Sequence, residues 1–303
     1  MGELLAVLAG ALRISTPYTL AALGGALSER SGVVNIALEA GLLMGALAHA
    51  VVAHASGSPW LGLLAAMAAG VAVMALHAAL CLHARANHII VAVGLNLLAV
   101  GTGRFALKAL YNSAANGPRV DGFETTWWHA VQELPVAGTV AGTPLVLVAI
   151  LLVPAVAFLV DRTVLGLRIR AVGQHPAAAE TQGVNVLRVR WAALLLCGLL
   201  CGLGGAYLAA DQHQFTQGMS AGRGFIAVSA VVFGQWRPAR VWVGCLLFGL
   251  LESLQISLQS SSVGIPGQLV QMLPYAMTLV VLALAASRAN APRALGQPWP
   301  AGR

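Results

Sequence analysis

Two acidic side chains lie inside apolar stretches, where few other groups could do chemistry. Glu39 follows Asn35 by four residues, and Glu252 lies in a later apolar segment. Ionisable groups inside membrane-spanning segments are rare and usually face the interior of a bundle or an aqueous path. The spacing predicts that Asn35 and Glu39 share one helical face. From that face the two side chains would line a polar path, act with Glu252 as ion sites, or support a broken or neighbouring helix by hydrogen bonds. A single acid binds several hydroxyl groups poorly, so we favour the third role, in which Glu39 supports another helix.

The remaining polar and sulfur-containing residues predict no catalytic or metal centre. Asn96 is a further polar group within an apolar segment, and Cys197 and Cys201 lack a histidine cluster that would complete a metal site. The chain contains no HExxH or GxSxG motif, and Lys108, its sole lysine, lacks the spacing of a nucleotide-binding loop. We therefore expect no enzyme, no metal and no cofactor on this chain.

The composition is that of a membrane protein. Hydrophobic residues make up 58% of the 303 positions, charged residues only 9%, and the mean hydropathy is +0.81. Soluble domains carry about 25% charged residues. We predict an all-α, polytopic transmembrane helical bundle of eight or nine spans. The spans are expected at about 4–27, 31–55, 60–82, 87–110, 142–160, 191–210, 224–258 taken as two, and 268–287. The stretch 224–234 is short enough to be a half-helix.

The basic residues predict the orientation of the chain. With alternating spans, twelve of the seventeen Lys and Arg residues fall on one side, which should be cytoplasmic, with the N-terminus outside and the C-terminus inside. These twelve are Arg30, Arg85, Arg162, Arg168, Arg170, Arg188, Arg190, Arg237, Arg240, Arg288, Arg293 and Arg303. The same rule explains the net charge of +7, so no nucleic-acid partner is expected.

Two long connections separate the spans of a transmembrane domain over residues 1–290, which a cytoplasmic tail, 291–303, follows. The first, 111–142, should be periplasmic and carries Trp127 and Trp128, which fit an interfacial belt. The second, 161–190, should be cytoplasmic. Within it, a short helix containing Glu180 is bracketed by Gly173, Pro176 and Gly183. A docking element for a cytoplasmic partner explains this loop better than a solvated linker does.

Small residues predict close helix contacts. Gly41 and Gly45 form one small-xxx-small pair, and Gly198 and Gly202 lie along a face of another span. The tetrapeptide LGGA occurs at residues 23–26 and 203–206, before two glycine-interrupted spans on opposite sides of the membrane, as an inverted repeat would require.

Four ordered stretches carry a family resemblance. They are Ser28–Glu39 with Gly41 and Gly45; 85–98, from RANHII to LNLL; 165–186, from LGLRIRAVGQHPAAAE to GVNV; and 222–234, from GRGFIA to VFG. Together they resemble permease subunits of ABC importers in the branched-chain amino acid and ribose permease superfamily. The simple-sugar and nucleoside branch is the most similar. Ala40 and His88 stand where that family often has glycine and glutamine.

The resemblance implies partners and roles. Two such permeases, usually non-identical, would enclose a pathway in the cell membrane. An ATPase dimer would bind ATP below them, and an extracytoplasmic substrate-binding lipoprotein would deliver a nucleoside or simple sugar. Residues 172–186 would be the coupling helix, with Gly173, Pro176, Glu180 and Gly183. The pathway and its signature would include Asn35, Glu39, Asn96, Phe225 and Glu252. The alternative is an ion-coupled secondary transporter that uses Glu39 and Glu252.

Overall fold

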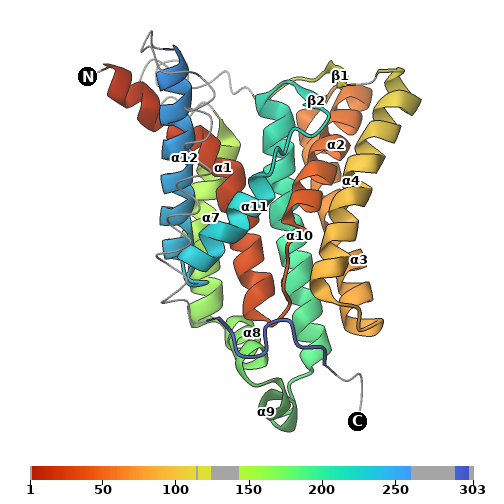
Figure 1. Ribbon diagram of the computed structural model, residues 1–303, viewed down its shortest axis with the longest axis vertical. Coiled ribbons are helices and arrows are strands. Elements are labelled where there is room, and N and C mark those ends of the chain that lie inside the picture. The colour runs from red at the N-terminus through yellow and green to blue at the C-terminus, as the bar shows by residue number, and fades with distance from the viewer. Residues whose placement is uncertain (1, 114, 124–142, 261–290, 300–303) are drawn as a thin grey trace.

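Seven long apolar helices dominate the computed structural model, which describes residues 2–113, 115–123, 143–260 and 291–299 (Figure 1). They are α1 (Gly2–Arg30), α2 (Leu38–Ser56), α3 (Pro59–Ala78), α4 (His88–Tyr111), α7 (Pro144–Arg162), α10 (Val186–Asp211) and α12 (Pro238–Ser260). Each is long and apolar enough to cross a bilayer about 30 Å thick. The prediction of an all-α, multi-pass bundle is confirmed.

Shorter elements complete the described part of the chain. A π-helical turn, η1 (Ala79–His83), extends α3. The helices α8 (Val164–Gln174) and α9 (Pro176–Thr181) lie at one end of the bundle, and α11 (Arg223–Phe233) crosses its middle obliquely (Figure 1). At the opposite end, β1 (Asn116–Arg119) pairs antiparallel with β2 (Gln214–Thr216). This main-chain clasp between two loops was not predicted, because its residues show no strand periodicity.

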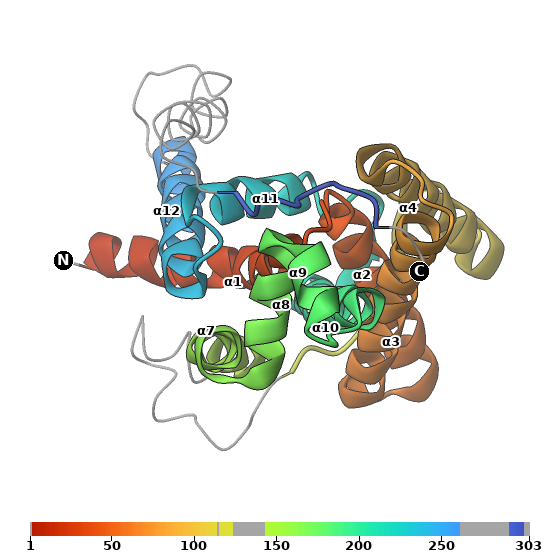
Figure 2. The ribbon, with the colours of Figure 1, turned by 90° about the horizontal axis from the view of Figure 1, so that it is seen from below.

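Helix α10 is the centre of the bundle. It packs against α1, α2 and α3, as the view from below shows (Figure 2). Of its most apolar 18-residue stretch, 72% is buried, the largest share among the seven long helices. Small residues fill the contacts: the buried set on α10 includes Ala193, Gly198, Gly202, Gly205 and Ala206. Lipid and side chains are equally apolar, so close backbone packing of this kind is a main source of helix association in membranes.

The glycines singled out from the sequence lie where backbones nearly touch. A Cβ atom added at Gly45 would lie 3.0 Å from the Gly202 Cα, and one at Gly41 would lie 2.8 Å from the Cys201 Cβ. At the contact with α3, a Cβ at Gly198 would lie 2.6 Å from the Gly70 carbonyl oxygen, and one at Gly202 would collide with the Ala66 carbonyl oxygen. The glycines thus let α2 and α3, which also pack against each other, both approach the α10 backbone closely.

Three predicted boundaries were wrong. Helix α1 runs to Arg30 rather than to residue 27, α10 begins at Val186 rather than at 191, and α2 begins at Leu38 rather than at 31. The break between α1 and α2 has a local cause: Gly32 has a φ of +95°, outside the helical region, and residues 33–36 have no helical assignment. The segment Ser31–Ala37, called the strap below, therefore lies outside both helices, and only its end residues, Ser31 and Ala37, share helical hydrogen bonds with α1 and α2.

Several predictions lie outside the described residues. They are the span at 268–287, Trp127 and Trp128 with most of the loop at 111–142, and the basic residues Arg288 and Arg303. The inverted repeat stays a prediction, although the two LGGA segments do lie in helices that run in opposite directions, α1 and α10 (Figure 1).

We expect Gly202→Ala to destabilise the protein by about 1–3 kcal/mol, because its methyl group would enter the α3 backbone. Gly101→Ala on α4 is the matched control: nothing lies within 4 Å of its added Cβ, so the better helix propensity of alanine should leave stability unchanged or raised. Thermal unfolding of the detergent-solubilised transporter measures both. Equal midpoints for the two variants would contradict the close contact at Gly202.

Candidate functional site

The Glu39 carboxylate joins two helix N-termini. Glu39 lies in the first turn of α2, and its Oε1 and Oε2 accept hydrogen bonds from the backbone N–H groups of Gly222 (2.9 Å) and Gly224 (2.7 Å) at the start of α11. The first N–H groups of a helix have no partner inside the helix, and the helix dipole places partial positive charge there. A buried carboxylate with both oxygens so occupied is a cap for α11.

Local sequence makes this approach feasible. Gly222 has a φ of +81°, which turns the chain into α11, and a Cβ at Gly224 would collide with the Glu39 backbone. The Gly-Arg-Gly run therefore lets the α11 backbone reach the carboxylate. With eleven residues, α11 is about 16 Å long, half of the bilayer core.

The opposite end of α11 is held by a second glutamate. Trp236, three residues beyond the helix, donates from Nε1 to Glu29 Oε2 at 2.6 Å, and both residues are buried. Glu29 stands ten residues before Glu39, on the other side of the strap. The two carboxylates thus hold α11 at both ends, and the short helix and the strap form one unit.

Two asparagines satisfy the backbone where the strap enters α2. Asn96 of α4 accepts from the Ala40 N–H (3.0 Å) and donates to the Ile36 carbonyl (3.2 Å). Asn35 accepts from the Ala37 N–H (3.1 Å), and its amide nitrogen lies 3.2 Å from Met74 Sδ. The prediction that Asn35 and Glu39 share a helical face was wrong, because Asn35 belongs to the strap and α2 starts three residues later.

Glu252 is compensated within the bundle. Its Oε1 lies 3.4 Å from an Arg223 guanidinium nitrogen, and its Oε2 accepts a hydrogen bond from the Tyr18 hydroxyl. Arg223 is the first residue of α11, so this ion pair ties the start of α11 to α12. Phe225 differs from the other predicted pathway residues, because its side chain is 49% exposed on the outer surface of α11.

The residues predicted for coupling lie on α8, α9 and the turn that follows (Figure 1). Pro176 begins α9 and is buried, whereas Glu180 is exposed. Gly183 ends this segment with a φ of +79°. Gly173 lies against the end of α1: a Cβ there would collide with the Arg30 carbonyl oxygen. The predicted short helix exists, while the longer α8 before it was missed.

A buried arginine, Arg190, lies at the same end of the bundle. It was predicted to lie in the cytoplasmic loop 161–190, but it belongs to α10. Arg190 is fully buried on α10 and donates to the Ser31 carbonyl (3.1 Å) and the Gln297 carbonyl (3.0 Å). The segment 291–299 continues this network, because the Ala294 N–H donates to the Gly173 carbonyl and the Gly296 N–H to the Gly32 carbonyl, both at 2.9 Å. The available signal was the spacing of Arg188 and Arg190, which would turn to different faces of a helix that begins before them.

Together these features define a class of protein. A capped half-helix inside a multi-pass bundle is the arrangement that membrane transporters use to place irregular backbone at membrane depth. The family described as "Branched-chain amino acid transport system / permease component" matches residues 7–282. The chain belongs to this family of permeases, whose members are transport components rather than enzymes.

Curated relatives match over nearly their whole length. The guanosine ABC transporter permease protein NupQ of Bacillus subtilis is 38% identical, with 95% of this chain and 94% of the relative covered. The nucleoside ABC transporter permease protein NupC of Lactococcus lactis is 36% identical, with coverage of 96% and 95%. The putative glucose ABC transporter permease protein TsgC13 of Haloferax volcanii is 38% identical, with coverage of 93% and 92%. No solved structure matches the chain.

We expect Glu39→Gln to lower stability by about 1–3 kcal/mol, because the amide keeps one acceptor and turns its NH₂ group toward a backbone N–H. Asp121→Asn, an exposed loop position, is the control and should leave the thermal midpoint of the purified transporter unchanged. A Glu39→Gln protein as stable as the control would show that the carboxylate does not hold α11.

Proposed function

We propose that this chain is the membrane-spanning subunit of an ABC importer for a nucleoside, with a simple sugar as the second candidate solute. The observation that carries the proposal is the full-length similarity to permeases named for guanosine and for nucleosides. A relative named for glucose, at 38% identity, keeps the sugar as the alternative. We choose a nucleoside as the first candidate solute because two of the three relatives are named for guanosine or nucleosides.

ATP would be used by a separate subunit that rests against α9. This helix extends beyond the bundle and turns Ala177, Ala178, Glu180 and Thr181 to its exposed side, with Pro176 and Ala179 buried beneath. Such a helix can enter a groove on an ATPase without disturbing the spans. Because α8 and the segment 291–299 attach to the strap, a push on α9 would reach the base of the unit formed by the strap and α11.

The orientation follows from the same assignment. If α9 meets the ATPase, then the end that carries Arg168, Arg170 and Arg188 is cytoplasmic, in agreement with the positive-inside rule. The N-terminus and the β1–β2 clasp would then face outward, where a substrate-binding lipoprotein delivers the solute (Figure 1). ATP would stay on the partner ATPase dimer, with no cofactor on this chain.

A second, homologous permease would complete the pathway. Helix α11 buries Gly224, Ala227, Ala230 and Val231 against the bundle and leaves Phe225 exposed on its other side. An outward half-helix of this kind suits a pathway wall shared by two subunits, with lipid around the remaining spans. Asn35, Glu39 and Asn96 would shape that wall from behind without touching the solute.

The alternative, an ion-coupled secondary transporter, finds little support in the surroundings of the two carboxylates. Both Glu39 oxygens accept backbone N–H groups, and Glu252 is paired with Arg223 and Tyr18. A carboxylate that carries a proton or cation through a cycle needs oxygens that become free in one state. In the structure these oxygens hold helices together.

Uptake by the reconstituted complex tests the proposed function. Vesicles are prepared that hold this chain with its ATPase and partner permease, and the binding protein is added outside. They should accumulate guanosine only when ATP is present inside them, on the cytoplasmic side of the transporter. Collapse of the proton gradient should leave the initial rate unchanged. Accumulation that follows the gradient without ATP would instead establish the secondary transporter, and uptake of glucose but not guanosine would assign the sugar.

Charge reversal on α9 tests the coupling assignment. Glu180→Arg should lower guanosine uptake by about tenfold, since coupling free energies of 1–3 kcal/mol are typical, without a change in the thermal midpoint. Asp121→Arg, at the opposite end of the bundle just after β1 (Figure 1), is the matched reversal and should retain uptake. Normal uptake and normal stimulation of ATP hydrolysis in Glu180→Arg would remove α9 from the interface.

A further inference from the structure

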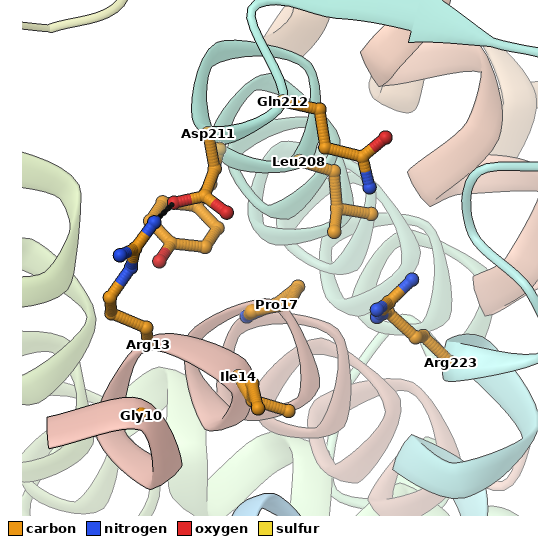
Figure 3. Close-up of a pocket in the computed structure, with 9 residues that line it drawn as sticks. Gly10, Arg13, Ile14, Pro17, Leu208, Asp211, Gln212 and Arg223 are labelled. Carbon is orange, nitrogen blue, oxygen red and sulfur yellow. Dashed lines mark hydrogen bonds and ion pairs between the residues drawn. The ribbon is translucent and has the colours of Figure 1, made fainter. Parts of the chain in front are cut away.

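A cavity of about 220 Å³ lies between α1, α10 and the start of α11 (Figure 3). Arg13 of α1, Asp211 at the end of α10 and Arg223 of α11 stand around it. These positions belong to the end of the bundle where the N-terminus and the β1–β2 clasp lie (Figure 1). None of these residues takes part in the α9 network or in the cap formed by Glu39.

The lining combines an apolar floor with polar rims. Figure 3 shows Ile14 and Pro17 of α1 below, with Arg13 and Asp211 on one side and Gln212 and Arg223 on the other. A small-molecule site commonly has such a lining, mostly apolar with a few placed polar groups.

One buried hydroxyl at the cavity lacks a partner. Tyr207 lines the cavity and is 2% exposed; its hydroxyl has no hydrogen bond of normal geometry within the described part of the chain, and Arg13 and Thr16 are its polar neighbours. A buried hydroxyl left unpaired costs about 1–3 kcal/mol, and such groups in native proteins call for an explanation. The hydroxyl has almost no accessible surface, so a hydrogen-bonding molecule in the cavity would remove this cost only after the Tyr207 ring turns toward it.

The charges around the cavity cancel. Arg13 pairs with Asp211 at 2.6 Å, and Arg223 pairs with Glu252 at 3.4 Å. A phosphorylated solute would need an excess of positive charge, which these pairs do not offer. A paired carboxylate still has lone pairs to accept from a hydroxyl, and a guanidinium still has N–H groups to donate. A neutral diol, in which each hydroxyl both donates and accepts, matches this pattern.

Size narrows the ligand further. Pockets that enclose a drug-sized molecule measure about 300–1,000 Å³, so 220 Å³ is room for one ring rather than for a whole nucleoside. The apolar floor suits the C–H face of a sugar ring, and the ion pair at its edge suits the vicinal hydroxyls. A nucleoside would place its ribose inside and leave its base toward the opening.

We propose that this cavity is a solute subsite that binds the vicinal-diol edge of a furanose or pyranose ring through Arg13, Asp211, Tyr207 and Gln212. The inference rests on the proposed function, because it takes the solute to be a nucleoside or a simple sugar. The subsite receives the ring at the outer end of the bundle, after the binding protein releases it, and is emptied as the solute moves on. Its affinity is therefore weak.

Saturation-transfer NMR on the purified transporter without binding protein tests the subsite. Guanosine should receive saturation at its ribose protons, whereas 2′,3′-dideoxyguanosine, which lacks the diol, should receive little. Tyr207→Phe and Gln212→Ala should each weaken guanosine binding by about threefold to tenfold, the usual effect of one lost hydrogen bond. Saturation transfer to glucose, without saturation transfer to guanosine, would show that the subsite binds a sugar ring rather than a nucleoside.

Tyr111→Phe is the matched control, because Tyr111 at the end of α4 does not line the cavity. It should bind guanosine as the unaltered protein does. Equal saturation of guanosine and its dideoxy analogue, unchanged binding in both cavity variants, or a cavity that holds water alone would overturn the subsite. If uptake by the complete system persists in those cases, the proposed function stands; if the complete system moves neither solute, the proposed function fails independently.

Discussion

The hydrogen bonds from the α11 N-terminus to Glu39 are the constraint on which the rest of the architecture depends. Backbone polar groups at membrane depth must find partners inside the protein. Each break in this bundle meets that requirement with a side chain: Asn96 and Asn35 serve the entry to α2, and Glu39 serves the entry to α11. The costly burial of an acid is offset by two charge-assisted hydrogen bonds and a helix dipole. Without it, a half-helix of eleven residues would have exposed N–H groups in an apolar layer.

The spacing of Glu29 and Glu39 turns this local cap into a larger rigid element. Because the two glutamates bracket the strap and reach opposite ends of α11, the strap and α11 cannot move apart without breaking buried hydrogen bonds. The base of the strap is attached in turn to Arg190, to Gly173 through the segment 291–299, and thus to α8. Displacement at the α9 end therefore has a continuous hydrogen-bonded route to a helix near the middle of the bundle.

The sequence was sufficient to predict the helical bundle, the short α11 and the helix at Glu180, because hydropathy, segment length and helix-breaking residues are local signals. It failed where the deciding contact is tertiary. Asn35 and Glu39 have helical spacing, yet the strap is unwound and its backbone is hydrogen-bonded by partners from α4 and α10 that are distant in sequence. Arg190 was read as a loop charge for the same reason: its partners at Ser31 and Gln297 lie more than one hundred residues away. The cavity could not be inferred at all, since α1, α10 and α11 contribute to it separately.

The pairing of charges also bears on where the driving force acts. Within the described residues, Glu39, Glu29 and Glu252 each hold a structural partner, and Asp211 is paired with Arg13. These buried carboxylates are all committed to holding helices, so among the described residues none of them can take up and release an ion without loosening the packing. This agrees with the proposal that a separate ATPase supplies the energy for transport from outside the spans. In the proposed assembly, the exposed face of α9, joined to the strap through α8 and the segment 291–299, would receive it.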